Sequence, residues 1–174
     1  MQINNKQYGW FIKIDHHSQS KIKGFEDYVP LIHFKDTISV PKIGIDDTKV
    51  STNKRFTCGI LIISVNPTSR STEITHKLMG ESTDNDAHKS TMDTIKIIRS
   101  EIVNGNNHSK ILEEIEYTKC MVNEMTLEGT ESIRTYTIIY KKRLEKIHDY
   151  DTNGDHRGSA RCEIDFDRGN SRHL

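Results

Sequence analysis

Acidic residues next to histidines are the first place to look for chemistry in this chain. A strand-like segment ends in Asp15-His16-His17, the order in which one phosphoesterase superfamily delivers ligands to a metal pair. That chemistry needs more carboxylates from earlier strands, and the thirteen residues before Ile14 contain no Asp or Glu. Solvated loop histidines are therefore the favoured interpretation. A metal-dependent hydrolase that uses Asp15, His16 and His17, together with residues 149–155, is the less favoured alternative.

A second candidate metal site begins at Asp149. Asp149, Asp151, Asn153 and Gly154 match the opening of a calcium-binding loop, D-x-D-x-N-G. The twelfth position of such a loop supplies a bidentate glutamate, and here it is Ala160. The flanking segments also have a β rather than a helical pattern. We expect a polar hairpin turn here and no calcium site.

The other histidines and cysteines show no spacing typical of a site. None of the nine histidines belongs to an HxH or HxxxH pair. Cys58, Cys120 and Cys162 are odd in number and far apart, which predicts buried, reduced thiols rather than disulfides. The chain also lacks a GxSxG motif and a phosphate-binding glycine loop. We expect no catalytic residue, no metal and no cofactor, and hence a protein that is not an enzyme.

The overall composition excludes several classes of partner. The chain has 174 residues, with Lys+Arg and Asp+Glu both at 25, so no net charge attracts nucleic acid or anionic lipid. The longest strong apolar run, residues 60–63, is far shorter than the ~20 residues of a membrane helix. The N-terminus lacks the features of a signal peptide. We expect a protein made in the cytosol, without membrane insertion or nucleic-acid binding.

The hydrophobic pattern of the chain is that of β-strands, and these strands must position any site. Apolar residues alternate with polar ones in residues 8–14, 29–40 and 92–103, and in a long hairpin over residues 131–167. In the hairpin, Tyr136, Ile138 and Tyr140 share a face, and Asn153-Gly154 allows a tight reversal. Residues 55–65 are apolar on both faces, so this strand should be covered on both sides. Residues 110–125 fit both a helical stripe and a strand, and we favour the strand.

Two further segments complete the expected architecture. Residues 69–79 have the capping residues of a helix, with Ser69 at the start and Gly80 at the end. Residues 43–54 form a long stretch without periodicity, and such loops are usually functional or disordered. We therefore predict a mainly β protein: an antiparallel β-barrel with one short flanking α-helix, in a single domain over residues 1–174.

Several of these segments resemble the haemolysin-coregulated protein (Hcp) family, the tail-tube subunits of bacterial type VI secretion systems. FIKID, from Phe11, resembles the family's opening strand, and RFTCGILIISVNPTSRSTEITHKLMGE, from Arg55, its strand, linker and helix. The strand predicted at residues 110–125, with MVNEM, is similar to the segment before the last hairpin. TYTIIYKKRLEKIHDYDTNGDHRGSARCEIDFD, from Thr135, resembles the terminal hairpin most closely.

The resemblance implies a structural function. It implies hexameric rings that stack into a tube, are secreted, and hold effector proteins in the lumen. The implied partners are further copies of the chain, the tube-tip, sheath and baseplate proteins, and the effectors. The implied location is cytoplasmic, then secreted without a cleaved signal peptide. We expect the loop residues Asp46, Asp47, Lys49 and Lys54 to contact the next ring. A monomeric binding or adaptor β-barrel is the main alternative.

Overall fold

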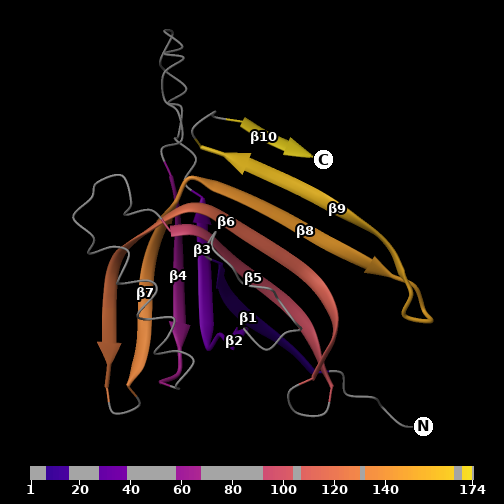
Figure 1. Ribbon diagram of the computed structural model, residues 1–174, viewed down its shortest axis with the longest axis horizontal. Coiled ribbons are helices and arrows are strands. Elements are labelled where there is room, and N and C mark those ends of the chain that lie inside the picture. Colours follow the sequence, from indigo (N-terminus) through magenta and orange to yellow (C-terminus); the bar gives the residue numbers. More distant parts are fainter. Residues whose placement is uncertain are drawn as a thin grey trace, which may run out of the picture.

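The computed structural model describes residues 7–15, 28–38, 58–67, 92–103, 107–129, 132–166 and 170–173. These residues form ten β-strands and no helix (Figure 1). The strands are β1 (Gln7–Asp15), β2 (Val29–Pro30), β3 (His33–Ile38), β4 (Gly59–Val65), β5 (Met92–Val103), β6 (Asn107–Glu128), β7 (Ile133–Tyr140), β8 (Lys142–Tyr150), β9 (His156–Asp165) and β10 (Asn170–His173). Every pairing between them is antiparallel. None of the described residues forms a helix that could cross a membrane.

The pairing of six strands and their closing segment forms a closed barrel within the chain. The pairing runs from β1 to β5, β6, β7, β4 and β3. The segment that contains β2 and β3 joins the two ends, because β2 pairs with β1 and β3 pairs with β4. Between these strands, the Leu31 N–H donates to the Trp10 carbonyl and the Ile32 N–H donates to the Ser64 carbonyl, both at 2.9 Å. The predicted antiparallel barrel is confirmed, and residues 29–38 are its closing segment.

A three-stranded extension leaves this barrel at Lys141. β7 and β8 follow one edge of β6 as a nearly continuous strand, and the Lys141 N–H donates to the Thr118 carbonyl between them. On the other edge the partner changes, because β7 pairs with β4 whereas β8 pairs with β9. β9 in turn pairs with β10. We call β8, β9 and β10 the arm; Figure 1 shows its β8–β9 turn projecting away from the barrel.

The turn at the tip of the arm is the polar reversal that the sequence predicts. Tyr150 pairs with His156, and the Gly154 N–H donates to the Asp151 carbonyl at 3.0 Å. Gly154 has a φ of +89°, which glycine adopts without steric cost. One carboxylate oxygen of Asp151 accepts the N–H groups of Asn153 and Asp155, both at 2.9 Å. The Asp151 side chain therefore caps the turn, because it accepts two backbone N–H groups of the turn itself.

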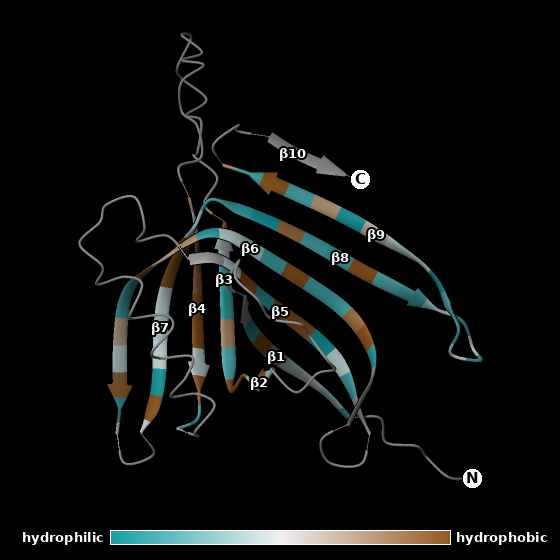
Figure 2. Ribbon diagram, in the orientation of Figure 1, coloured by the Kyte–Doolittle hydropathy of each residue, from teal (hydrophilic) through white to brown (hydrophobic). Residues whose placement is uncertain are grey.

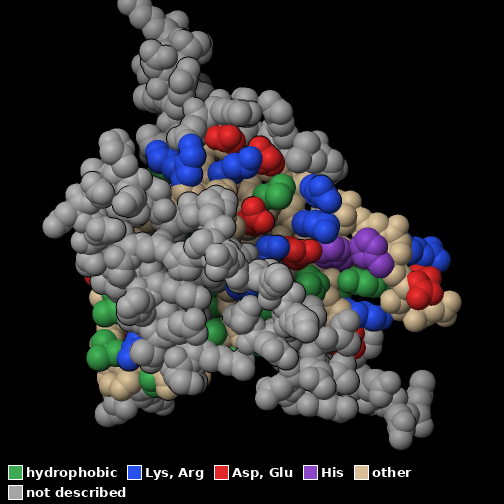
Figure 3. All heavy atoms as spheres, in the orientation of Figure 1, with side chains coloured by type: hydrophobic (Ala, Val, Ile, Leu, Met, Phe, Trp, Pro, Cys, Tyr) green, Lys and Arg blue, Asp and Glu red, His purple; other side chains and the backbone are tan. Residues whose placement is uncertain are grey.

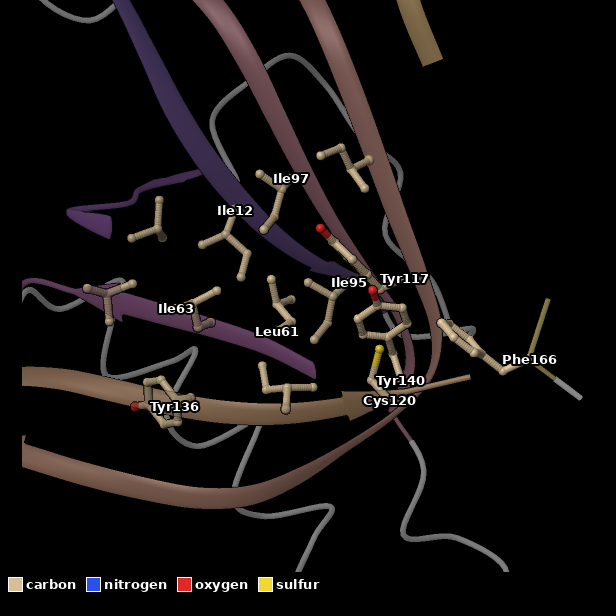
Figure 4. Packing of buried hydrophobic residues seen from close by; sticks show 14 residues of the cluster. Ile12, Leu61, Ile63, Ile95, Ile97, Tyr117, Cys120, Tyr136, Tyr140 and Phe166 are labelled. Carbon is tan, nitrogen blue, oxygen red and sulfur yellow. The ribbon is translucent and has the colours of Figure 1, made fainter. Parts of the chain in front are cut away.

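The hydrophobic core lies between the strands of the barrel. Figure 4 shows side chains from β1 and β5 facing those from β4, with Tyr117, Tyr140, Cys120 and Phe166 at one end. The Tyr140 ring contacts the rings of Tyr117 and Phe166 at centroid distances of 4.8 and 5.7 Å. β4 is the most continuously hydrophobic strand (Figure 2). The expected cover on both faces of β4 is only partial, since Ile60 is 37% exposed.

β6 settles the ambiguity of residues 110–125. It is a strand of 22 residues, and its path changes at Lys119, whose φ is +55°. A register irregularity follows between Val122 and Glu124, where β6 pairs with β7. Such bulges bend a strand, and here the bend carries β6 from the β5 side of the barrel to β7. The favoured strand prediction is confirmed, whereas the predicted helix at residues 69–79 lies outside the described residues.

Replacing Gly59 by Ala should lower stability. A Cβ atom at this position of β4 would lie 2.1 Å from Cζ of the buried Tyr140 ring, so the ring has to move. Overpacking of this kind costs about 1–3 kcal/mol. Gly158 is the matched control, because a Cβ there meets nothing within 4 Å. Urea unfolding should show a loss for Gly59→Ala and almost none for Gly158→Ala; equal effects would contradict this packing.

Candidate functional site

A buried polar cluster lies where the closing segment meets the start of the arm. The Asp36 carboxylate of β3 accepts hydrogen bonds from the hydroxyls of Tyr117 (3.1 Å) and Tyr140 (2.5 Å) and from Nε of Arg143 (2.7 Å). The side chains of Asp36 and Arg143 are only 12% and 11% exposed. We call these four residues the Asp36 cluster; it joins β3, β6, β7 and β8.

The electrostatics of the Asp36 cluster favour a structural role. Burial and the neighbouring Asp36 raise the pKa of both tyrosine hydroxyls far above the ordinary value. Burial lowers the pKa of Arg143, but its hydrogen bonds to Glu145 and Asp36 outweigh this and raise the pKa overall. The hydroxyls therefore stay protonated and the guanidinium stays charged, so all three groups are donors to one acceptor. This arrangement holds strands together and offers no activated nucleophile or base.

A second cluster lies on the arm and the strands beside it. Glu114 of β6 accepts a hydrogen bond from Nε2 of His148 at 2.6 Å, and lies 3.5 Å from Nζ of both Lys96 and Lys146. Nδ1 of His148 is 3.1 Å from Nε2 of His156 across the hairpin. We call these residues the Glu114 cluster. Figure 3 shows histidine side chains beside basic and acidic ones in this part of the surface.

Glu114 is held in its charged form. Burial raises the pKa of its carboxyl group, but the hydrogen bond from His148 and the charges of Lys96 and Lys146 outweigh burial and lower it overall. An ionised carboxylate can only accept hydrogen bonds. Nε2 of His148 must therefore carry the hydrogen that it shares with Glu114.

The structure places only some of the residues singled out from the sequence. Asp15 is the last residue of β1 and pairs with Thr94, while His16 and His17 lie outside the described residues. The expected ring-stacking residues are likewise outside them: Asp46, Asp47, Lys49 and Lys54. Among the described side chains, no group of three or more His, Cys, Asp or Glu residues is placed to hold a metal ion.

The cysteines agree with the sequence prediction to different degrees. Cys120 is fully buried, and burial raises the pKa of its thiol to about 12. Cys58 and Cys162 are thiols as well, but they are only half-buried. The prediction of a buried, inert thiol therefore holds for Cys120 alone.

Sequence reasoning missed both polar clusters. Asp36 meets partners 81 to 107 residues further along the chain. His148 and His156 are eight residues apart, a spacing that no metal motif contains. The turn at Asn153-Gly154 was the one available signal, because a hairpin centred there brings the two histidines to opposite strands.

Solved structures with the same architecture are found by comparison of the whole chain. One described as a type six secretion system protein aligns with a TM-score of 0.60 and 11% identity, over 95% of this chain and 100% of its own. Hcp1 from Salmonella typhimurium aligns with a TM-score of 0.59 and 10% identity, over 96% and 99% of the two chains.

The chain has the Hcp fold. Hcp3 from Pseudomonas aeruginosa aligns with it as well, at a TM-score of 0.53 and 10% identity, over 92% of this chain and 99% of the other. The resemblance inferred from the strand patterns is thus confirmed at the level of the Hcp fold. No protein-family model matches the sequence, and no curated protein matches it.

Removing the Asp36 carboxylate should be strongly destabilising. Asp36→Ala leaves two buried hydroxyls and the Arg143 guanidinium without their shared acceptor, and breaking a buried ion pair in this way costs about 3–5 kcal/mol. Glu163→Gln is the control, since its 3.2 Å ion pair with the more exposed Lys142 is worth less than about 1 kcal/mol. Chemical unfolding of both variants measures the difference. Equal losses would show that the cluster does not hold the barrel.

The protein should lose stability in alkaline solution through Tyr117. Its folded-state pKa is raised above the unfolded value of about 10, so the folded form keeps a proton that the unfolded form releases. This contribution is fully present below pH 10 and is lost as the pH rises further, by up to about 1.4 kcal/mol per pH unit. Tyr117→Phe should flatten the decline between pH 10 and 11, whereas Tyr8→Phe, at an exposed position, should not. If stability declined equally steeply with pH in both variants, Tyr117 would not be the source of the alkaline loss.

Proposed function

We propose that this protein is a structural subunit of a type VI secretion tube and not an enzyme. The observation that carries the proposal is the Hcp fold over nearly the whole chain, which aligns over 96% of its length with 99% of Hcp1 from Salmonella typhimurium. The Asp36 cluster supports it, since its buried ion pair and two buried hydroxyls are engaged in holding strands together. The single domain of residues 1–174 would be the repeating unit.

We infer that the subunits form hexameric rings, which stack into the tube. The described barrel strands are paired in turn from β1 through β5, β6, β7 and β4 to β3, and residues 29–38 join the two ends. Contacts between copies must then rely on side chains and loops. The outer face offers a short apolar row where Ile139 pairs with both Ile60 and Met121, and these two are about two-fifths exposed.

The remaining parts of the proposal follow from this assembly. Effector proteins would occupy the lumen of the stacked rings, and tube-tip, sheath and baseplate proteins would contact the tube from outside. The protein would be made in the cytoplasm and leave the cell with the tube, without a cleaved signal peptide. Asp46, Asp47, Lys49 and Lys54 would contact the neighbouring ring through their charges, so stacking should weaken as salt screens them.

Assembly is the test that separates this function from its rivals. Negative-stain electron microscopy and native mass spectrometry of the purified protein should show six-membered rings, and stacks of rings at low salt. A monomer would support a binding or adaptor barrel, and a monomer with bound metal and phosphodiesterase activity would support the hydrolase. Monomers at every protein and salt concentration would refute the tube proposal.

Replacing residues 46–54 by a short Gly-Ser connector should abolish stacks and secretion while rings persist. The variant loses the charged side chains proposed to bridge rings, but the described strands and the Asp36 cluster are unchanged. A matched control keeps the loop length and exchanges only Thr48 and Val50 for Ser. Circular dichroism checks folding, and microscopy with a secretion assay measures the outcome. Normal secretion by the connector variant would show that this loop does not join the rings.

A further inference from the structure

Two histidine rings face each other near the tip of the arm. Nδ1 of His148 and Nε2 of His156 are 3.1 Å apart, with the ring centroids 5.2 Å apart and the planes inclined by 57°. They belong to β8 and β9, on either side of the turn capped by Asp151. The side chain of His148 is only 10% exposed, whereas His156 is exposed. One ring is thus fixed by its surroundings and the other can adjust.

The 2.6 Å contact with Glu114 occupies Nε2 of His148 and leaves Nδ1 available. Since Glu114 accepts a hydrogen bond at Nε2, the neutral form of His148 carries its hydrogen on that atom. Nδ1 then presents a lone pair toward His156. A histidine that donates its far N–H to a carboxylate is the usual arrangement of a metal-ligating histidine, because the carboxylate fixes the tautomer and raises the basicity of the ligand.

The separation of the two nitrogens also fits a metal ion. Zinc–nitrogen bonds are about 2.0–2.1 Å long. Two such bonds that meet at roughly 90–110° place the nitrogens about 2.8–3.4 Å apart, and the observed 3.1 Å lies inside this interval. The lone pairs must converge on one point, so the exposed His156 ring has to turn and direct its Nε2 lone pair at the ion. In the absence of a metal, the same two atoms share one hydrogen.

We propose that His148 and His156 form a two-histidine site for a divalent transition metal such as Zn²⁺, Ni²⁺ or Cu²⁺, with Glu114 as the positioning residue. The metal takes the place of the shared hydrogen, which moves from Nε2 to Nδ1 of the neutral His156 ring, and water completes the coordination. Acid opposes binding, because protons compete for the same lone pairs. A bound ion links β8 to β9 beside the turn and so stiffens the end of the arm. The proposal does not rest on the tube function.

Calorimetric titration of the untagged full-length protein with NiCl₂ and with ZnCl₂ tests the site. We expect one ion per chain at pH 7.5, and at least a tenfold loss of affinity for this ion in His148→Ala and in His156→Ala. Zn²⁺ should also shift the ¹⁵N resonances of His148 Nδ1 and His156 Nε2. His33→Ala, which removes an exposed histidine of β3, is the control and should leave the affinity unchanged.

Glu114 is tested by a pair of variants. Glu114→Ala should weaken metal binding roughly 10–100-fold, the usual effect of losing such an outer partner. Glu114→Gln keeps an oxygen that accepts from His148 and should recover part of the affinity, which a merely destabilised arm would not do. Urea midpoints confirm that each variant is folded. Undiminished binding in His156→Ala, or no binding by the parent protein at millimolar metal, would show that the pair is only a hydrogen bond.

Discussion

The carboxylate of Asp36 is the acceptor on which the junction of barrel and arm depends. Burying this charge is costly, and the cost is offset because Tyr117, Tyr140 and Arg143 all donate to it. β3 has only six residues and is paired on one side by β4. The hydrogen bonds of Asp36 attach this short strand to β6, β7 and β8 through side chains, where backbone pairing does not reach.

The barrel and the arm share β6 and the nearly continuous β7–β8 strand. β6 and the nearly continuous β7–β8 strand stay together over their length, but β4 completes a closed barrel on one side of Lys141, and β9 opens an arm on the other. The tight contact between Gly59 and the Tyr140 ring lies next to this division. The rings of Tyr117, Tyr140 and Phe166 lie together at this end of the core (Figure 4). The hydroxyls of Tyr117 and Tyr140 donate to Asp36 there.

Local sequence patterns predict most of the strands, but they do not predict which polar side chains come into contact. Alternation with a period of two predicts β1, β5 and β7, and apolar residues on both faces predict β4. Residues 110–125 do not fit this pattern, because the positive φ of Lys119 interrupts the alternation. The buried Tyr117 and Cys120 are therefore three residues apart, which is a helical spacing. The Asp36 cluster and the contact of Glu114 with His148 could not be predicted, because they depend on the register of strands distant in sequence.

The closing segment also constrains the order of events on the ribosome. Residues 29–38 are synthesised early. The hydrogen-bond partners of Asp36 follow 81, 104 and 107 residues later in the chain, and β4 cannot pair with β7 until β7 has been made. Non-local pairings of this kind make folding slow, since long loops must close before any contact rewards them. Until residues 133–140 emerge, β4 lacks its partner β7, and the apolar side chains of β4 are without their native cover. Transiently exposed apolar strands of this kind are prone to aggregation.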